Sequence, residues 1–466
     1  MSSDIRSDAV NALRDRAVRL RNRARYSVGH RPARAAAVAF AAATLVFTAL
    51  LMMPSAAADG TATPLEDAWF TAVSAVTVTG LTTVDTAEHW SMFGHVVILA
   101  AIQTGALGVV TIALLLAMTV TRRLGISGRV FAKESIGADD MGSVGRLLRV
   151  VVVTTLLFEV CLAAFLVPAF ISVEESVVWG SWYGIFYAVS AFGNAGFTVH
   201  SGGLAMFEDN PFVLAPIAIG VFVGSFGFPV FLNLIRARWT RHKWTLHTKL
   251  TLITTTVLLV AGAIAWAAFE WANPDTVAGE PWWRKLGVAV FSSAMMRSGG
   301  FAVVDPEAST TTTMLLSDAL MFVGGGSGST AGGIKVTTLA VLFLAIVAEA
   351  RGTRNTNALG RRLPDGTLRL AISVVFLGAT LVFVASALLT IVSDAALDRI
   401  LFEVISAFAT CGLSVGISAE VDAFGKYVLS ALMLTGRVGP IVLASALAVR
   451  QRRELYEYPP ERLIIG

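Results

Sequence analysis

The chain has 466 residues, of which 55% are hydrophobic and only 15% are charged, and its mean hydropathy is +0.71. A soluble domain carries about 25% charged residues, so the composition excludes an ordinary soluble protein and indicates one embedded in a membrane. The two cysteines, Cys161 and Cys411, provide neither a disulfide framework nor a thiolate metal cluster. The net charge is +4, but the positions of the charges along the chain are more informative about its organisation than their sum.

Eight apolar stretches are long enough to cross a bilayer as helices, which takes about 20 residues. They are 35–54, 91–120, 150–172, 211–236, 249–270, 313–349, 368–393 and 422–449. When these stretches are taken two at a time, a shorter apolar segment lies within each pair, at 65–77, 178–192, 286–296 and 400–410. Because these segments are too short to span, we expect re-entrant helices that enter the membrane and turn back.

Lysines and arginines are strongly segregated between the two sides. Nine arginines precede the first span. The loops after the second, fourth and sixth spans and the end of the chain lie on the same side of the membrane as this segment, and together these parts contain 29 of the 36 basic residues. The loops that flank the short segments contain only Arg284, Lys285, Arg399 and Lys426, together with many acidic residues. The positive-inside rule therefore predicts cytoplasmic termini and short segments that enter from outside.

The end of each short segment carries the same pattern: Ser-Ala, a few residues, glycine, then Leu or Phe. The four copies are Ser74-Ala-Val-Thr-Val-Thr-Gly80-Leu81, Ser190-Ala-Phe-Gly-Asn-Ala-Gly196-Phe197, Ser293-Ala-Met-Met-Arg-Ser-Gly299-Gly300-Phe301 and Ser406-Ala-Phe-Ala-Thr-Cys-Gly412-Leu413. The third copy has one extra residue, so Gly299 or Gly300 could be the equivalent of Gly80, and the following Phe301 favours Gly300. A single glycine after a helix is commonly a C-cap, but four matching copies indicate an internal repeat.

These repeats predict an all-α integral membrane protein with four units of helix, re-entrant pore helix, filter loop and helix around a central pore. The expected divisions are a basic cytoplasmic segment 1–34, pore repeats 35–121, 147–238, 247–350 and 367–450, and a cytoplasmic tail 451–466.

Non-helical backbone at membrane depth is tolerated where it lines a water-filled cavity. Four glycine loops around one axis would form a ring of carbonyl groups that replaces the hydration shell of a cation, and glycine permits the positive φ values that such loops need. The C-terminal ends of the pore helices would add partial negative charge toward the axis. This argument predicts a cation pore and does not separate K⁺ from Na⁺.

The loops resemble those of the Trk/Ktr/HKT superfamily of potassium transporters, and the chain is most similar to the membrane subunit of the Ktr type. The resemblance depends on Thr77-Val-Thr-Gly80-Leu81, Asn194-Ala-Gly196-Phe197, Arg297-Ser-Gly-Gly300-Phe301 and Thr410-Cys-Gly412-Leu413. Two more stretches match, the glycine-rich segment 324–335 and Gly436-Arg437-Val-Gly439-Pro440.

The resemblance implies K⁺ as substrate, and it leaves open whether Na⁺ acts as an activator. It implies a homodimer with one pore per chain, bound to a cytoplasmic ring of nucleotide-binding regulatory subunits, in the plasma membrane. The implied filter comprises Thr79, Gly80, Ala195, Gly196, Gly299, Gly300, Cys411 and Gly412, with K⁺ at the carbonyls of Gly80, Gly196, Gly300 and Gly412. The implied supporting residues are Thr77, Asn194, Arg297 and Thr410. The third loop departs from the family pattern at Ser298-Gly299 and the fourth at Cys411, which leaves fine selectivity open.

The sixth stretch is interrupted by Gly-Gly-Gly-Ser-Gly-Ser-Thr-Ala-Gly-Gly-Ile-Lys at 324–335. Each glycine inside a helix costs about 1 kcal/mol relative to alanine, so we expect a flexible intramembrane loop. The resemblance implies that this loop acts as the gate. The expected gate residues are Gly324, Gly325, Gly326, Gly328, Gly332, Gly333, Lys335 and Arg437. The segment lacks the Gly-Lys-[Ser/Thr] of a phosphate loop, and no strand precedes it as in a dinucleotide site. Close helix packing through small residues is the alternative.

Charged residues within the spans are functional candidates because they are costly there. Arg437 is expected to hold the gate loop or to oppose a cation, or to pair with Glu159 or Glu403. Arg297 is expected to brace the third loop with Glu403 or Asp305. We expect Glu159 to be a buried brace and His200 to be a solvated loop residue.

The leading hypothesis is channel-like potassium uptake, and the alternative is a coupled secondary transporter whose broken sixth helix binds another cation or a small solute. An enzyme is not expected, because the six histidines are scattered and no catalytic cluster converges. No tightly bound cofactor is expected. The arginine-rich N-terminal segment is expected to lie on anionic lipid or on the regulatory ring, not on nucleic acid.

Overall fold

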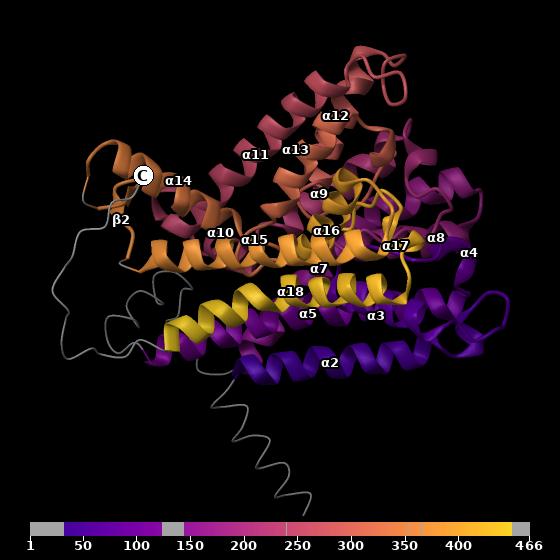
Figure 1. Cartoon of the computed structure of the whole chain (residues 1–466), viewed down its shortest axis with the longest axis horizontal. Coiled ribbons are helices and arrows are strands. Elements are labelled where there is room, and N and C mark those ends of the chain that lie inside the picture. Colours follow the sequence, from indigo (N-terminus) through magenta and orange to yellow (C-terminus); the bar gives the residue numbers. More distant parts are fainter. Residues whose placement is uncertain (1–31, 124–143, 239, 354, 365, 450–466) are drawn as a thin grey trace, which may run out of the picture.

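The computed structural model describes residues 32–123, 144–238, 240–353, 355–364 and 366–449 (Figure 1). The predicted basic N-terminal segment, apart from its last three residues, and the predicted tail lie outside these residues. The described chain is mostly helical. Its long helices are α2 (Pro32–Leu51), α3 (Leu65–Thr77), α5 (Met92–Arg123), α7 (Val144–Glu174), α8 (Val177–Gly193), α9 (Pro211–Gly224), α10 (Phe228–Arg236), α11 (Leu246–Glu270), α12 (Trp282–Met295), α13 (Thr311–Phe322), α14 (Val336–Ala350), α15 (Thr367–Val392), α16 (Leu397–Ala409) and α18 (Ala423–Val449).

Short elements occupy the connections between these helices. They are η1 (Pro54–Ala56), α4 (Thr86–His89), η3 (Ala205–Phe207), η4 (Arg241–Lys243), η5 (Pro306–Ala308), α17 (Ile417–Glu420) and the antiparallel hairpin of β1 (Asn357–Ala358) and β2 (Arg361–Arg362).

All four predicted short segments are helices. The first has the predicted bounds, and the third, α12, begins four residues earlier than expected, at Trp282. The predicted break in 313–349 is also present, because α13 ends at Phe322 and α14 begins at Val336.

The stretch 211–236, expected as one span, is not one straight helix. The chain bends by 89° between α9 and α10, at Ser225-Phe-Gly-Phe-Pro229. Gly227 has a φ of 92°, and Pro229 occupies the first turn of α10. Glycine permits this backbone conformation, and proline is accepted in the first turn of a helix but disrupts a helix interior.

Three described helices are long and apolar enough to cross a membrane: Arg149–Glu174, Leu246–Glu270 and Thr367–Val392. The bent pair of α9 and α10 would be a fourth if it is one span. Shorter apolar helices are present at Val38–Leu51, Met92–Gly108 and Val336–Ala350.

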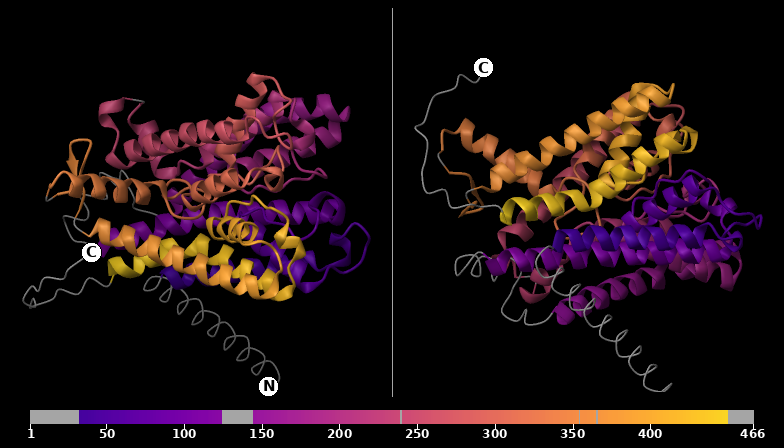
Figure 2. Two further views of the ribbon diagram at one scale, coloured as in Figure 1. Left: turned by 45° about the horizontal axis from the view of Figure 1, so that its top comes forward. Right: turned by 60° about the horizontal axis from the view of Figure 1, so that its bottom comes forward.

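The helices form four groups that close into a ring. Within the groups, α3 packs between α2 and α5, α8 between α7 and α9, α12 on α11, and α16 between α15 and α18. Between the groups, α5 packs on α7 and α8, α9 on α12, α13 on α16, and α18 on α3 and α5. The last group therefore lies beside the first, as both views of Figure 2 show for the yellow and indigo helices.

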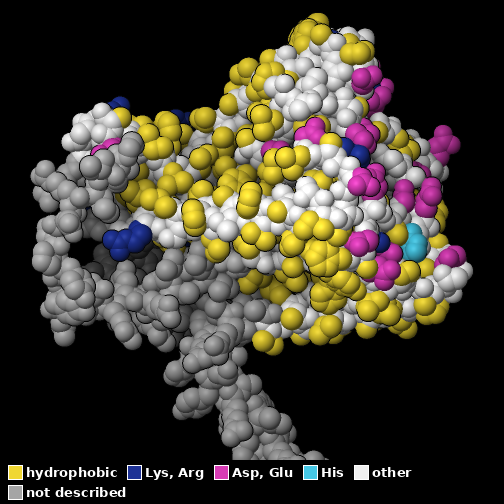
Figure 3. All heavy atoms as spheres, in the orientation of Figure 1, with side chains coloured by type: hydrophobic (Ala, Val, Ile, Leu, Met, Phe, Trp, Pro, Cys, Tyr) yellow, Lys and Arg dark blue, Asp and Glu magenta, His cyan; other side chains and the backbone are white. Residues whose placement is uncertain are grey.

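Charged side chains are unevenly distributed along the long axis of the molecule. In Figure 3 hydrophobic side chains cover the middle of the visible face, and acidic side chains gather at the end where α4, α8 and α17 lie in Figure 1. Exposed carboxylates there include Glu208, Asp209, Glu307 and Glu420. An uncharged middle with a charged end is the pattern expected of a membrane-embedded protein.

Candidate functional site

The four glycine loops share one backbone conformation. The φ angle is positive at Gly80 (98°), Gly196 (67°), Gly300 (71°) and Gly412 (96°). It is also positive two residues earlier in each loop, at Val78 (57°), Asn194 (59°), Ser298 (115°) and Thr410 (47°). Left-handed conformations at non-glycine residues are uncommon, so their recurrence at one position of all four loops is a property of the repeat.

Each of these four glycines lies against the next loop, at the carbonyl oxygen of the residue just before that loop's own glycine. The fourth loop contacts the first in the same way, so the four loops form a closed cycle. A Cβ atom added to Gly80 would collide with the carbonyl oxygen of Ala195, and one added to Gly196 would lie 3.2 Å from that of Gly299. A Cβ on Gly300 would lie 2.5 Å from the carbonyl oxygen of Cys411, and one on Gly412 would collide with that of Thr79. The four loops therefore surround one axis, with backbone packed so closely that side chains are excluded.

This geometry decides between the two candidate glycines of the third loop. Gly300 has the positive φ and contacts the second and fourth loops. Gly299 occupies the position of Thr79, Ala195 and Cys411, and its absent Cβ faces Met295 and Val221. Gly300 is thus the equivalent of Gly80.

The serine at the start of each repeated pattern contacts the backbone near the loop. Ser74 Oγ accepts a hydrogen bond from the Gly80 amide (3.0 Å), and Ser406 Oγ accepts one from the Gly412 amide (3.1 Å). Ser190 Oγ donates to the Phe197 carbonyl oxygen (3.0 Å). In the third copy Ser293 Oγ instead donates to the Leu259 carbonyl oxygen (2.8 Å) on α11, so the longer loop is held differently.

The predicted supporting residues lie against the loops. The hydroxyl oxygens of Thr77 and Thr79 are 2.7 Å apart, and the Thr77 hydroxyl also donates to the Val73 carbonyl oxygen (2.7 Å). The Thr410 carbonyl oxygen accepts from Ser298 Oγ (3.3 Å), which joins the third and fourth loops. Asn194 is fully buried and caps α8.

Arg297 does not pair with Glu403 or Asp305, so that expectation is wrong. Its side chain is buried, and Nη1 donates to the Thr255 carbonyl oxygen (2.8 Å) on α11, away from the axis. Asp305 instead caps η5 by accepting from the Glu307 amide. Arg297 therefore braces the third loop from behind through a backbone carbonyl.

Glu403 pairs with neither Arg437 nor Arg297, the two partners considered from the sequence, and it has a different role. Its buried carboxylate accepts hydrogen bonds from Ser414 Oγ (2.8 Å), the Val415 amide (3.1 Å) and the Ser418 amide (3.2 Å), and it also accepts from Ser418 Oγ. These donors lie in the chain that leaves the fourth loop. Glu403 therefore fixes the path of the backbone beyond Gly412, and the serines that follow a filter loop are the sequence signal for it.

The glycine-rich segment 324–335 lies across the C-terminal ends of α8 and α16. Thr330 Oγ1 donates to the Phe192 carbonyl oxygen (3.2 Å) at the end of α8, and it lies 3.1 Å from the Gly224 carbonyl oxygen at the end of α9. A Cβ on Gly332 would collide with the Thr410 hydroxyl. The segment is also tied to the bend in the 211–236 stretch, since the Gly326 amide donates to the Ser225 carbonyl oxygen (2.7 Å).

Two basic side chains hold this segment through its carbonyl groups. Arg437 on α18 is buried and donates through Nη1 to the Thr330 carbonyl oxygen. Lys335 Nζ donates to the carbonyl oxygens of Ala331 (2.6 Å) and Gly332 (3.1 Å). The ion-pair alternatives for Arg437 are not formed, because Glu159 accepts from Gln103 Nε2 (3.1 Å) and Glu403 is bonded as described above. Glu159 is buried, as expected of a brace.

Three further glycines contact the last turns of the pore helices, and the sequence analysis missed them. A Cβ on Gly105 of α5 would collide with the Val76 carbonyl oxygen. Gly224 of α9 and Gly436 of α18 have the same relation to the carbonyl oxygens of Phe192 and Phe408. In the sequence, these residues could have been found as a glycine in the second long helix of the first, second and fourth repeats. Helices that approach each other closely select small residues at their contact.

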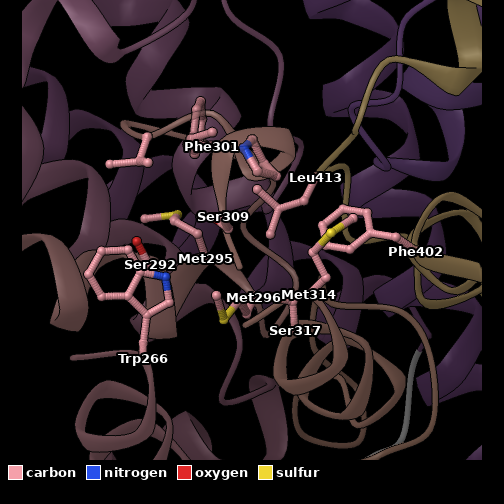
Figure 4. Close-up of a pocket in the computed structure, with 13 residues that line it drawn as sticks. Trp266, Ser292, Met295, Met296, Phe301, Ser309, Met314, Ser317, Phe402 and Leu413 are labelled. Carbon is pink, nitrogen blue, oxygen red and sulfur yellow. The ribbon is translucent and has the colours of Figure 1, made fainter. Parts of the chain in front are cut away.

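A cavity of about 30 Å³ lies behind the third and fourth loops (Figure 4). Met295, Met296 and Met314 point into it together with Phe301, Phe402 and Leu413. Its volume is enough for about one water molecule. It lies behind the closed cycle and is lined by flexible methionines, so it is a packing gap of the scaffold.

His200 is not a solvated loop residue. Its side chain is 8% exposed, and its ring stacks on Phe170 and Tyr187. Nδ1 lies 2.8 Å from the Tyr187 hydroxyl and Nε2 lies 3.1 Å from Glu174 Oε1. Burial lowers the pKa of His200, and the hydrogen bond to Glu174 opposes that shift.

Long apolar helices around a closed cycle of backbone loops define this chain as a membrane transport protein. The model of the TrkH family, described as a cation transport protein, matches residues 22–454. The chain therefore belongs to the TrkH family of cation transport proteins.

Curated relatives match over nearly the whole chain. The Ktr system potassium uptake protein B of Vibrio alginolyticus is 34% identical, over 92% of this chain and 94% of its own. The potassium/sodium uptake protein NtpJ of Enterococcus hirae is 33% identical over 90% of this chain and 93% of its own. The Ktr system potassium uptake protein D of Bacillus subtilis is 33% identical over 93% of this chain and 97% of its own.

A solved structure has the same fold. The crystal structure of the potassium transporter TrkH from Vibrio parahaemolyticus superposes with a TM-score of 0.68, over 89% of this chain and 84% of that one, at 17% identity.

Proposed function

We propose that this chain takes up potassium ions through a pore on the axis of its four glycine loops. The observation that carries the proposal is the closed cycle, in which Gly80, Gly196, Gly300 and Gly412 each abut the carbonyl of the next loop. A ring of carbonyl groups without a fixed carboxylate suits an alkali cation that has lost its water. The choice of K⁺ is supported by three relatives that are named potassium uptake proteins.

In this proposal the carbonyls of the four glycines and of Thr79, Ala195, Gly299 and Cys411 form the selectivity filter. Thr77, Asn194, Arg297 and Thr410 position the loops from behind. The C-terminal ends of α3, α8 and α16 also direct their partial negative charge toward the axis, which favours a cation over an anion.

The segment 324–335 is proposed to be the gate. It lies against Phe192, Gly224 and Thr410, next to the filter loops, and Arg437 and Lys335 hold it through carbonyl oxygens. Opening would require Thr330 to leave its partners on the second and fourth groups together. Glycines at six positions make such a rearrangement feasible.

We further propose eight spans in four repeats, with both termini cytoplasmic, in the plasma membrane. The orientation is supported by the clustering of Lys and Arg in the termini and in the loops predicted on the same side of the membrane. The acidic end in Figure 3 would then face outward, where carboxylates raise the local concentration of cations.

Dependence on Na⁺, assembly as a homodimer and binding to a cytoplasmic nucleotide-binding ring belong to the same proposal. One relative is named a potassium/sodium uptake protein, and two are named as proteins of a Ktr system. These names support a sodium effect and additional components.

The decisive experiment is uptake of radioactive rubidium, a potassium analogue, into liposomes that contain the purified protein. We expect uptake that K⁺ inhibits and that runs down its own gradient, with Na⁺ added or omitted to reveal activation. A coupled secondary transporter of another solute would instead show no rubidium flux without that solute. Failure of the chain, with its regulatory partner, to restore growth of a bacterium that lacks potassium uptake would also contradict the proposal.

A further inference from the structure

A deep apolar groove lies between α7 and α9, on the outside of the second group. We refer to it as the α7–α9 groove, and its volume is about 730 Å³. None of its lining residues is charged. The polar side chains Ser172 and Asn210 line it near the C-terminal end of α7 and the N-terminal end of α9, and Phe158, Phe192 and Val223 line it farther along the helices.

Two prolines and several small residues explain why the groove exists. Pro168 lies inside α7 and Pro216 inside α9, and both line the groove. A proline inside a helix removes a backbone hydrogen bond and bends or loosens the helix. Ala169, Ala215 and Gly220 are also in the lining, so no large side chain fills the space between the two helices.

The dimensions of the groove match one leaflet of a bilayer. From Pro211 to Val223 its wall on α9 rises about 18 Å at 1.5 Å per residue, while one leaflet of hydrocarbon is ~15 Å thick. In the proposed orientation, Ser172 and Asn210 lie at the outer headgroup level and the apolar part extends to the middle of the membrane.

The groove is continuous with surface that would face lipid. Phe165, Phe212 and Ile219 line its rim and are 69%, 76% and 59% exposed. Apolar surface within a bilayer is covered by hydrocarbon unless protein covers it, and lipid is always present there. A second copy of the chain would need a protruding element of matching length to fill a groove this deep.

We propose that the α7–α9 groove binds one acyl chain of an outer-leaflet phospholipid. The proposal depends on the proposed membrane placement and orientation of α7 and α9, and not on ion conduction. At its inner end the groove reaches Phe192, which is 1% exposed and whose carbonyl oxygen accepts the Thr330 hydroxyl of the gate segment.

The test compares two matched substitutions. Ala215→Trp places an indole in the groove, whereas Ala387→Trp places the same group on an exposed position of α15, away from the groove. Each protein is extracted in mild detergent and its retained phospholipids are counted by native mass spectrometry. We expect Ala215→Trp to retain one phospholipid fewer per chain than the wild type, and Ala387→Trp to retain the wild-type number.

Equal lipid numbers in all three proteins would overturn the proposal. So would a change in oligomeric mass in Ala215→Trp without loss of lipid, which would assign the groove to a second copy. Recovery of a fatty acid or detergent mass in place of a phospholipid would overturn the choice of ligand.

A second measurement follows a cysteine of the wild-type chain. Cys161 is exposed and lines the groove, whereas Cys411 is buried. Phospholipid added to delipidated protein in detergent should slow alkylation of Cys161 by a maleimide several-fold. The control is Ala387→Cys in a Cys161→Ala background, and equal slowing at both positions would contradict a specific site. Both readouts are independent of flux, so they remain informative if the chain does not conduct potassium.

Discussion

At the scale of single residues, the filter glycines are constrained by space as well as by backbone conformation. Gly196 has a φ of 67°, and an added Cβ would lie 2.9 Å from the Gly300 Cα. Gly196→Ser should therefore displace the second and third loops and weaken K⁺/Na⁺ discrimination. A loss of ~1.4 kcal/mol in differential binding corresponds to about a tenfold lower permeability ratio, to be measured as relative rubidium and sodium flux in liposomes.

Gly202→Ser is the matched control for this substitution. Gly202 has a similar φ of 77°, but an added Cβ would have no atom within 4 Å. The backbone strain is thus comparable, and only the contact with a neighbouring loop differs. Equal loss of discrimination in both variants would show that strain alone, and not the closed cycle, explains the effect.

His200 gives a pH prediction outside the spans. Burial lowers its pKa, so the folded protein favours the neutral ring, which can accept from the Tyr187 hydroxyl and donate to Glu174. The stabilisation is complete above the unfolded pKa of about 6.5 and is lost as pH falls below it. The melting temperature in detergent should fall between pH 7.5 and 5.5 by more in the wild type than in His200→Gln, and parallel curves would exclude His200 as the titrating group.

At the scale of elements, one threonine of the gate segment contacts two groups of helices. Thr330 Oγ1 contacts the ends of α8 and α9, and its carbonyl oxygen accepts from Arg437 on α18. Thr330→Val keeps the shape but removes the hydroxyl. A lost buried hydrogen bond costs about 1–3 kcal/mol, so the closed gate should weaken and rubidium flux should rise.

Thr104→Val is the comparison for the gate variant. Thr104 Oγ1 donates to the Ala100 carbonyl oxygen within α5 and is exposed, so flux should not change. Lower flux in Thr330→Val, with the protein folded, would assign this segment a packing role instead of a gating role.

The pattern of elements shows what the sequence could and could not predict. The pore helices and their loops were predictable because Ser-Ala and glycine recur at one spacing in four apolar segments. The bend between α9 and α10 was missed because the mean hydropathy of 211–236 hides Ser225-Phe-Gly-Phe-Pro229, although Gly and Pro there signal a break. The partners of Thr330 and Arg297 were not predictable, because each is a backbone carbonyl oxygen of a distant segment that only the fold brings close.

At the scale of the whole molecule, polar contacts join successive groups of helices at the acidic end. Ser201 contacts Asp85 and Glu88, Arg284 pairs with Glu208 and Asp209, and Arg399 pairs with Glu307. Lys426 pairs with Asp67 and thereby joins the fourth group to the first. Arg284, Arg399 and Lys426, three of the four basic residues expected on the outer side, thus make contacts between groups. Each of the four groups is joined to the next by such a contact, and the fourth is joined to the first.

The junction of the fourth and first groups should contribute most to stability, because its ion pair is the least exposed. Asp67 Oδ1 lies 2.6 Å from Lys426 Nζ, with side chains 13% and 14% exposed, and it also accepts from Thr83 Oγ1 (2.7 Å). Asp67→Asn leaves the partly buried ammonium without its counter-ion, at a cost of about 1–3 kcal/mol. Glu307→Gln makes the same carboxylate-to-amide change in an exposed pair with Arg399, which is worth about 0–1 kcal/mol. Thermal unfolding in detergent should therefore show a larger loss of stability for Asp67→Asn, and equal losses would mean that closure of the ring depends on helix packing alone.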